Sequence, residues 1–207
     1  MHNAEAFWDR IAPKYAKKPV KNVNAYQQTM ERSRLYLSSS DEVLELGCGT
    51  GSTALLLADC VRHITASDIS SKMIGIAKRK AEQGRVDNVT FVQATPFDDR
   101  FEPGSFDVVL AYNFLHLLND VPAAVRRVAD LLRTNGVFVS KSVCLGNKGL
   151  PLRLFVRGLQ ALRVAPYVNF LKSRTLAADM EQAGLRIVET GDYPASPPNH
   201  FVVARKA

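Results

Sequence analysis

The sequence lacks any run of 18 or more apolar residues, the length at which a helix begins to span a bilayer. Residues 1–10 (MHNAEAFWDR) have neither a basic start nor an apolar core, so no secretory signal is expected. The three cysteines, Cys48, Cys60 and Cys144, are odd in number and lack CxxC spacing, which argues against a disulfide framework and against a zinc site. These absences predict a cytoplasmic protein with reduced thiols.

Acidic residues are also missing from one long segment. None occurs between Asp130 and Asp179, although eight basic residues lie there, and the charges in the rest of the chain nearly balance. The net charge of +7 therefore belongs to this segment, and we expect no nucleic-acid partner. We predict that residues 145–175 form a basic lid over an acceptor site; peripheral contact with an anionic membrane is the alternative.

Residues 151–164 within this segment have an amphipathic helical pattern. The apolar face consists of Leu152, Phe155, Val156, Leu159 and Leu162. The polar face consists of Arg153, Arg157 and Gln160. In the lid interpretation, the apolar face turns toward the domain.

The middle of the sequence alternates short β-rich runs with helical patterns. Strands are expected at residues 42–46, 62–67, 89–93, 106–112 and 137–143, and helices at residues 52–60, 70–83 and 121–133. Near-continuous apolar strands that alternate with helices are typical of a parallel sheet covered on both faces. The sequence therefore predicts one α/β domain over residues 1–207, doubly wound and mostly parallel, behind an N-terminal helical cover at residues 1–40.

The C-terminal part has a different pattern. A helix is expected from Ser173, acting as its cap, to about Ala183, and Gly184 ends it. Strands at residues 185–190 and 200–205 follow, and the turn-rich segment between them is too short for a crossover helix. These two strands should form an antiparallel hairpin at one edge of the sheet.

A glycine-rich loop, ELGCGTG at residues 45–51, follows the first strand and opens a helix. This is the position at which an α/β sheet presents free backbone amides to a ligand. The spacing is GxGxG, whereas a dinucleotide site has GxGxxG, whose third glycine would fall at Ser52. Glu45 is a poor neighbour for a pyrophosphate but a good one for a cationic ammonium. The loop therefore favours a zwitterionic ligand; a plain strand-to-helix turn is the structural alternative.

Asp68 follows the second predicted strand. A carboxylate at this point lies beside the glycine loop, where its two oxygens can accept both hydroxyls of an unphosphorylated ribose. The alternative is that Asp68 caps the helix that begins near Ser70, a role that Ser70 can fill equally well.

Taken together, these motifs resemble the class I S-adenosylmethionine-dependent methyltransferases, in particular the small-molecule branch that includes quinone-biosynthesis C-methyltransferases. The resemblance rests on VLELGCGTGS, on a DxSxxMxxxA pattern that starts at Asp68, and on PFDDRFEPGSFDVVLAYNFLHLL followed by LLRTNGVFV. It extends from about Phe7 onward. It implies a Rossmann-like seven-stranded sheet whose last strand is antiparallel.

The resemblance also implies S-adenosylmethionine as the cofactor and assigns residues to it. The residues expected at its methionine end are Glu45, Gly47, Cys48, Gly49, Gly51 and Ala111. Asp68 would bind the ribose and Ile69 would pack on the adenine. Tyr15, in the segment FWDRIAPKYA, is similar to a tyrosine that closes over the methionine end. The alternative for that segment is an amphipathic helix packed on the domain.

One position departs from the family pattern. After the third strand the family usually has an acidic residue near the adenine amino group, and this sequence has Thr95 there. Pro96 and Phe97 are expected to frame the adenine ring, with Asp98 or Asp99 as substitutes for the missing acid.

Methyl transfer from a sulfonium needs positioning, and it needs a base only when the nucleophile is protonated. His116, after the fourth strand, is the candidate base; the alternative is a histidine whose ring hydrogen-bonds the loop. The [DN]PP[YF] motif of nucleic-acid amino-methyltransferases is absent, and Cys144 is interpreted as a packed thiol. We therefore predict an enzyme that methylates a small, apolar or aromatic acceptor. The alternatives are a non-catalytic cofactor-binding regulator, an RNA methyltransferase and, opposed by the loop spacing, an NAD-dependent oxidoreductase.

Overall fold

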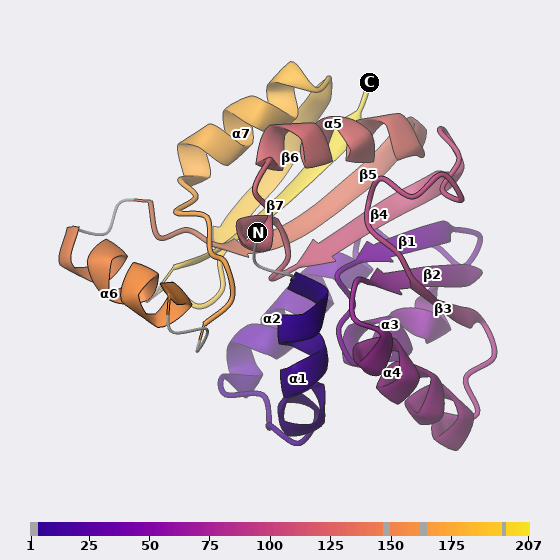
Figure 1. Cartoon of the computed structure of the whole chain (residues 1–207). Helices are drawn as coiled ribbons and strands as arrows, with labels where there is room; N and C mark the ends of the chain where they lie inside the picture. The colour runs from indigo at the N-terminus through magenta and orange to yellow at the C-terminus, as the bar shows by residue number, and fades with distance from the viewer. Residues whose placement is uncertain (1–3, 147–149, 162–164, 196–197) are drawn as a thin grey trace.

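The computed structural model describes residues 4–146, 150–161, 165–195 and 198–207. They form a seven-stranded sheet with the strand order β3-β2-β1-β4-β5-β7-β6 (Figure 1). The strands are β1 (Glu42–Leu46), β2 (His63–Asp68), β3 (Val89–Gln93), β4 (Phe106–Tyr112), β5 (Leu132–Val143), β6 (Leu185–Asp192) and β7 (Asn199–Lys206). The α-helices are α1 (Ala4–Ala16), α2 (Val23–Arg34), α3 (Ser52–Leu57), α4 (Ser71–Gly84), α5 (Val121–Leu131), α6 (Leu150–Ala161) and α7 (Ser173–Gln182). Short 3-10 helices occur at η1 (Ala58–Cys60) and η2 (Leu115–Leu117).

The strand directions confirm the predicted fold class. β1 to β5 are all parallel to one another, whereas β7 is antiparallel to both β5 and β6, between which it lies. The sheet is thus doubly wound and mostly parallel, with the expected antiparallel hairpin at its edge. Because these strands are parallel, the carboxyl ends of β1, β2 and β4 meet at one edge of the sheet. α/β folds bind their ligands at this edge.

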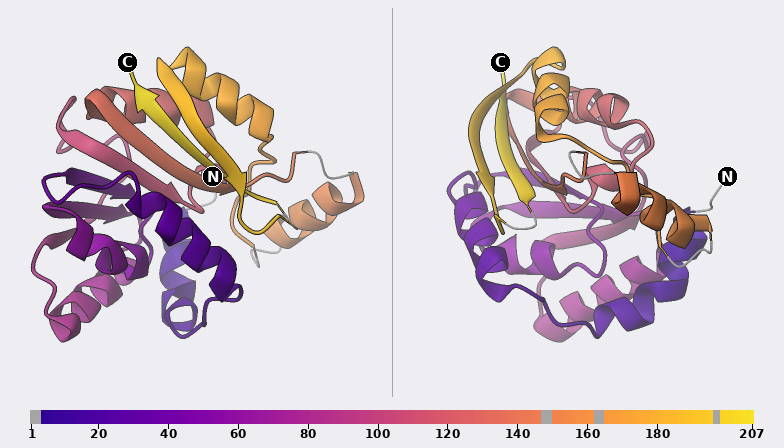
Figure 2. Two further views of the ribbon diagram at one scale, coloured as in Figure 1. Left: turned by 180° about the vertical axis from the view of Figure 1, so that it is seen from behind. Right: turned by 90° about the vertical axis from the view of Figure 1, so that its left-hand side faces the viewer.

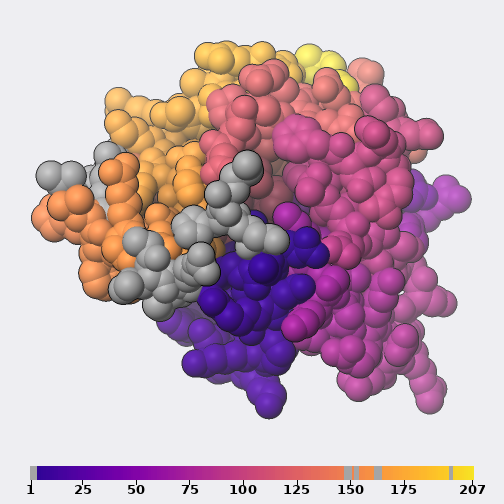
Figure 3. Space-filling model, in the orientation of Figure 1, coloured from indigo at the N-terminus to yellow at the C-terminus, as the bar shows by residue number. Residues whose placement is uncertain are grey.

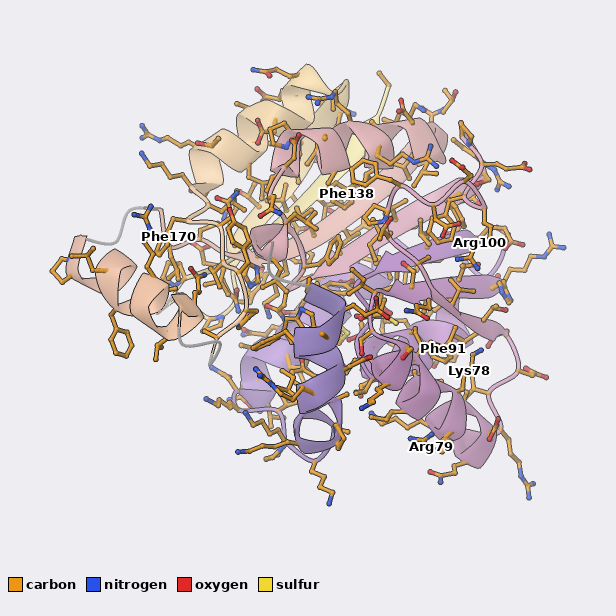
Figure 4. All side chains as sticks on the ribbon, in the orientation of Figure 1. Lys78, Arg79, Phe91, Arg100, Phe138 and Phe170 are labelled. Carbon is orange, nitrogen blue, oxygen red and sulfur yellow. The ribbon has the colours of Figure 1, made fainter. Side chains whose placement is uncertain are left out.

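Helices cover both faces of the sheet (Figure 2). On one face, Met30 of α2, Leu57 of α3 and Ile74 of α4 pack on buried strand residues. On the other face, α5 and α7 pack on a core that includes Phe138 of β5, which lies beneath α5 (Figure 4). Each core is continuous along its own face of the sheet, so the ligand-binding edge rests on a rigid support.

Several predicted boundaries are wrong by a few residues. α5 ends at Leu131, and β5 begins at Leu132, because Leu132 adopts extended backbone (ψ 140°) and pairs with Phe106 of β4. Ser173 is the first residue of α7 and does not cap it; Lys172 precedes the helix without a side-chain cap bond. α4 runs through Gly84, and Arg85 takes the left-handed conformation (φ 54°) that ends it.

The N-terminal segment contains α1 and α2. α2 is tied to the distant strand β6 by Arg32, whose guanidinium donates to both carboxylate oxygens of Glu189 at 2.7 and 2.6 Å. The hydroxyl of Tyr36 donates to the same carboxylate at 2.6 Å. The chain before β1 is therefore fastened to the part of the sheet formed by the C-terminal hairpin.

α6 projects from the body of the protein in Figure 1 and in the left view of Figure 2. Phe155 is 64% exposed, whereas Val156 and Leu159 are half-buried. The expectation that Phe155 turns toward the domain is wrong, because the body of the protein leaves this part of the helix surface uncovered. Leu162 and the side chains of Leu152 and Arg153 lie outside the described residues.

Two negative findings concern the described residues only. None of their helices combines the length and the apolar character needed to cross a bilayer. They also contain no group of three or more histidine, cysteine, aspartate or glutamate side chains placed to hold a metal ion.

Candidate active site

The three loop glycines all have positive φ angles, of 71° at Gly47, 55° at Gly49 and 74° at Gly51. A Cβ at Gly47 would lie 2.3 Å from the ring of Phe114, and one at Gly51 would lie 2.7 Å from the ring of Phe91. Gly49 differs, because the nearest atom to its Cβ position is in the Tyr15 ring at 3.9 Å. Gly47 and Gly51 are thus required by packing, and Gly49 borders an open space beneath Tyr15.

Glu45 is the fourth of the five residues of β1 and faces the start of α3. Its side chain is buried, with 2% exposure, and within the described residues Oε2 has no hydrogen-bond partner. Burial raises the pKa of this carboxyl to about 8, and the negative charge of Asp68 contributes in the same direction. A buried carboxyl oxygen without a partner is costly, and a cationic group bound beside it would relieve that cost. The residue therefore fits the ammonium of an amino-acid-like ligand.

Asp68 ends β2 and holds the glycine loop. Its Oδ2 accepts from the backbone amide of Gly49, and its Oδ1 accepts from that of Ser70, both at 2.9 Å. The helix cap is Ser70, whose Oγ accepts from Met73 N at 3.1 Å. The interpretation of Asp68 as the cap of α4 is therefore wrong. Each oxygen of Asp68 retains a lone pair for a ligand hydroxyl.

The loop after β3 lies next to Asp68, because the amide of Ala94 donates to the Asp68 carbonyl at 3.1 Å. Pro96 is buried, and Phe97 is half-exposed. Thr95 is exposed, and its Oγ1 accepts from the Phe97 amide at 3.3 Å. On the preceding strand, Gln93 donates from Nε2 to the carbonyl of Ile69 at 3.1 Å. The loop thus brings the predicted adenine-binding residues to one place.

The two acids offered as substitutes at this position are not equivalent. Asp98 is held by Arg100, whose Nε lies 2.7 Å from Oδ1, and these hydrogen bonds lower the pKa of Asp98 to about 2. Asp99 is exposed. Asp98 is therefore committed to its own turn rather than free for a ligand.

α1 places Tyr15 over the glycine loop. Tyr15 is 47% exposed, and its pKa is raised by burial and by the charge of Asp68. α1 packs on α4, and the two helices lie side by side at the surface (Figure 3). Ala12, a residue of α1, is fully buried. The segment is thus a packed helix that also holds Tyr15 next to Gly49, so the two interpretations of this segment are compatible.

Asp9 fastens α1 to the start of α4. Its Oδ1 accepts from Ser70 Oγ at 2.6 Å and from the backbone amide of Lys72 at 3.1 Å, and these bonds lower its pKa. The sequence analysis missed this residue, because the contact joins positions 61 residues apart. The only signal in the sequence was that Asp9 lies in the segment FWDRIAPKYA, which is similar to a segment of the family.

His116 lies in η2, which packs against β5. The side chain is buried, with 8% exposure, and burial lowers its pKa to about 4. Within the described residues, Nδ1 has no hydrogen-bond partner, and the loop contacts His116 through the backbone, where Asn169 N donates to its carbonyl at 2.7 Å. The ring is therefore neutral near pH 7, and its low pKa means that it accepts a proton only from a strongly acidic group. Ala111, at the end of β4, is fully buried.

Cys48 is buried in the glycine loop, and burial raises the pKa of its thiol well above the ordinary value. Cys144 follows β5, and burial together with Asp192 raises its pKa to about 11. Neither thiol is activated as a nucleophile.

Comparison with known proteins decides between the ligand classes that this geometry permits. A family model described as a methyltransferase domain matches residues 43–136, from β1 to the start of β5. Residues 43–136 are therefore a methyltransferase domain. The methyltransferase is 29% identical over 191 residues to the ubiquinone biosynthesis O-methyltransferase of Xanthomonas euvesicatoria pv. vesicatoria (strain 85-10), a match that covers 89% of this chain and 77% of that protein.

Two solved structures show the same fold at low identity. The [4+2]-cyclase SpnF superposes with a TM-score of 0.78 at 16% identity, covering 98% of this chain and 94% of its own. Geranyl diphosphate C-methyltransferase from Streptomyces coelicolor A3(2) superposes with a TM-score of 0.77 at 13% identity, covering 99% and 97%. The two superpositions confirm the predicted fold, and the family match confirms the predicted enzyme class, a methyltransferase. The resemblance pointed to C-methylating members, whereas the curated relative is named for O-methylation.

The state of Glu45 leads to a first prediction. The free protein holds this carboxyl protonated below about pH 8, and a bound ammonium favours the ionised form, so binding should release about one proton at pH 7. Affinity for S-adenosylhomocysteine should therefore rise with pH up to about 8. Calorimetry in phosphate and in Tris at pH 7 measures the released proton as a difference in apparent enthalpy.

Glu45→Gln should abolish this difference and weaken binding, whereas Glu42→Gln at the other end of β1 should change neither. An apparent enthalpy that is the same in both buffers for the wild type would show that Glu45 does not meet the ammonium.

The Asp9 contacts lead to a second prediction. Asp9→Ala removes the acceptor for Ser70 Oγ and Lys72 N, so α1 should open more readily and S-adenosylhomocysteine should dissociate about fivefold faster, the effect of about 1 kcal/mol. Trp8, the only tryptophan, lies on α1 with its ring 6.4 Å from that of Tyr15, and its fluorescence can follow dissociation in a stopped-flow instrument. The exposed Asp87, replaced by alanine, is the control. An unchanged dissociation rate in Asp9→Ala would mean that α1 does not cover the cofactor.

Proposed function

We propose that this methyltransferase transfers the methyl group of S-adenosylmethionine to a hydroxyl oxygen of a small aromatic or apolar acceptor. The observation that carries the cofactor half of the proposal is the buried Glu45 carboxyl, whose Oε2 lacks a partner within the described residues, beside the open space at Gly49. The small acceptor and the oxygen are supported by the near full-length similarity to an O-methyltransferase of ubiquinone biosynthesis.

In this proposal the cofactor residues divide into three groups, which bind the methionine end, the ribose and the adenine. Glu45 binds the ammonium, the loop residues Gly47, Cys48, Gly49 and Gly51 border the methionine end, and Tyr15 closes over it. Asp68 accepts from the ribose hydroxyls with the lone pairs left free by Gly49 and Ser70. Ile69, Pro96 and Phe97 frame the adenine, and the half-exposed ring of Phe97 is available for stacking.

S-adenosylmethionine supplies a methyl group bound to a sulfonium sulfur. When the methyl group is transferred by in-line displacement, the sulfur departs as a neutral thioether. The protein positions the acceptor oxygen, which accounts for most of the rate enhancement in such reactions. His116 accepts the hydroxyl proton at Nδ1 as the oxygen–methyl bond forms, because the ring is neutral and the proton becomes strongly acidic at that stage.

The basic segment at residues 145–175 covers the acceptor in this proposal. α6 and the chain that follows it lead to Asn169, which bonds the His116 carbonyl, so movement of the segment would reach the acceptor side. The exposed Phe155 leaves contact with an anionic membrane as the alternative use of α6. Salt-sensitive cosedimentation with anionic vesicles would favour that alternative over the lid.

The proposal is tested in two steps. Calorimetry should give micromolar binding of S-adenosylmethionine and no comparable binding of NAD. Incubation with S-adenosylmethionine and a catechol should then give an O-methylated product by mass spectrometry, with His116→Gln much slower but equal in cofactor affinity. Cofactor binding without methylation of any hydroxyl, amine or carbon acceptor in a broad panel would favour the non-catalytic alternative.

A further inference from the structure

Lys141 is a buried lysine on β5 that the proposed reaction does not use. The side chain is 6% exposed, and Nζ donates to Thr29 Oγ1 of α2 at 2.7 Å. The hydroxyl of Thr29 in turn donates to the Ala25 carbonyl at 2.6 Å. No ion pair among the described residues includes Lys141.

Such a side chain is costly for a fold. Burial lowers the pKa of Lys141 to about 8, so the ammonium is still mostly charged at pH 7. A buried charge without an opposite charge destabilises a protein, and an apolar residue of similar volume would fit the interior at lower cost. One neutral hydroxyl leaves two of the three N–H donors of the ammonium without an acceptor among the described residues. A retained charge of this kind is expected where an anion binds.

The position of Lys141 relates it to the cofactor site. In the sheet register it lies beside Tyr112 of β4 and Phe201 of β7. Tyr112 points to the α2 face, where its hydroxyl donates to Ser33 Oγ at 2.6 Å, and Glu45 is close enough to raise the Tyr112 pKa. Since β4 separates β1 from β5, and Lys141 lies two residues beyond Val139, the residue level with Glu45, the two residues are about 12 Å apart in the sheet. Lys141 is thus one strand beyond the methionine end of the site.

A second unpartnered group lies on β7, near Lys141. Asn199 pairs with Val143, two residues along β5 from Lys141. Its Oδ1 is buried and has no hydrogen-bond partner within the described residues. Alternation along the strands places Asn199 on the same face as Phe201 and Lys141. A cation and a neutral acceptor thus lie on one face of the sheet beyond the cofactor.

We propose that Lys141 binds a carboxylate of the acceptor and so makes the enzyme select monoanionic aromatic acceptors over neutral ones. This proposal rests on the proposed function, because it concerns the same acceptor: its hydroxyl meets His116, and its carboxylate reaches the α2 face of the sheet at Lys141. One ammonium balances one negative charge, which suits a carboxylate better than a diphosphate. The carboxylate displaces Thr29 Oγ1 as the partner of Nζ, and Asn199 Oδ1 accepts from a hydroxyl of the same acceptor. Lys141 is a specificity-determining residue and takes no part in proton transfer.

The test compares 3,4-dihydroxybenzoate with catechol, two probes that differ by the carboxylate. Calorimetry on protein saturated with S-adenosylhomocysteine measures both affinities without any turnover. The wild type should bind the acid about 10- to 100-fold more tightly than catechol, and Lys141→Met should remove this preference. Lys78→Met, on the exposed side of α4, should retain it (Figure 4). Affinity for S-adenosylhomocysteine confirms that each variant is folded.

Thermal melting separates binding from a purely structural role. Lys141→Met should melt at the same temperature as the wild type or higher, because it removes an unpaired buried charge. A wild type that prefers catechol or binds both probes equally would overturn the proposal without the need for any variant. A Lys141→Met protein that keeps the preference would overturn it as well.

The two proposals fail in different ways. If neither probe is methylated but the acid binds in a Lys141-dependent manner, the proposed reaction fails and the carboxylate site stands. If both probes are methylated with the same KM ratio in the wild type and in Lys141→Met, the reaction stands and the role of Lys141 is wrong.

Discussion

Asp68→Ala is expected to weaken the binding of S-adenosylhomocysteine by about 1.5 to 3 kcal/mol, or roughly 10- to 150-fold. The variant loses the acceptor for both ribose hydroxyls. It also releases the amides of Gly49 and Ser70, which Asp68 holds at 2.9 Å each, so the glycine loop is less well ordered before binding. Calorimetry measures the affinity, and urea denaturation measures the accompanying loss of stability, expected at about 1 to 2 kcal/mol.

Asp120→Ala is the matched control for this variant. Asp120 caps α5 by accepting from Ala123 N at 2.9 Å, and α5 contains none of the proposed cofactor residues. Its loss should cost about 1 kcal/mol of stability and leave the cofactor affinity unchanged. If the dissociation constant for S-adenosylhomocysteine is the same in Asp68→Ala and Asp120→Ala, Asp68 only stabilises the glycine loop and does not contact the ribose.

Gly51→Ala is expected to destabilise the protein by about 2 to 4 kcal/mol, the combined cost of a strained backbone and an overpacked site. The new Cβ would lie 2.7 Å from the ring of Phe91 on β3 and 2.8 Å from the Cβ of Ala77 on α4. Phe91 lies next to α4 within the core, so neither neighbour can move without displacing a helix or a strand (Figure 4). Urea denaturation of the ligand-free protein measures the change.

Two other glycines separate the causes. Gly184 has φ 79° and no atom within 4 Å of its Cβ position, so Gly184→Ala carries the backbone strain alone, about 1 to 2 kcal/mol. Gly49→Ala should lose a similar amount of stability but also lose cofactor affinity, because its Cβ enters the open space below Tyr15. Equal stability of Gly51→Ala and Gly184→Ala would mean that the core around Phe91 can accommodate the extra carbon.

The fold and the cofactor side of the site could be predicted because their signals are local. Gly47, Gly49 and Gly51 lie within five residues, and Asp68 ends the next strand, so strand-to-helix geometry alone brings them together. The start of β5 could not be predicted, because Leu132 becomes a strand residue only by pairing with Phe106. Local propensity there favoured the end of a helix, and pairing with a neighbouring strand overrode it.

The contacts that sequence reasoning missed are all long-range. Asp9 looks like an ordinary helix residue until α1 packs on α4, and Lys141 looks like a strand residue of the basic segment until α2 covers it. The charge count included Lys141 in the basic segment, whereas the side chain is 6% exposed. The strand pattern of residues 137–143 does not indicate that this lysine is buried without an opposite charge.

The position of β7 between β5 and β6 has a consequence for biosynthesis. β6 hydrogen-bonds to no strand other than β7 in the described sheet, yet β7 is translated after it. On the ribosome, β6 therefore waits without a partner until β7 has emerged and inserted between the two strands. Glu189 is part of β6, so the bidentate bond from Arg32, which ties α2 to this strand, also waits. One of the first helices to leave the ribosome thus makes its last contact only when the chain is nearly complete.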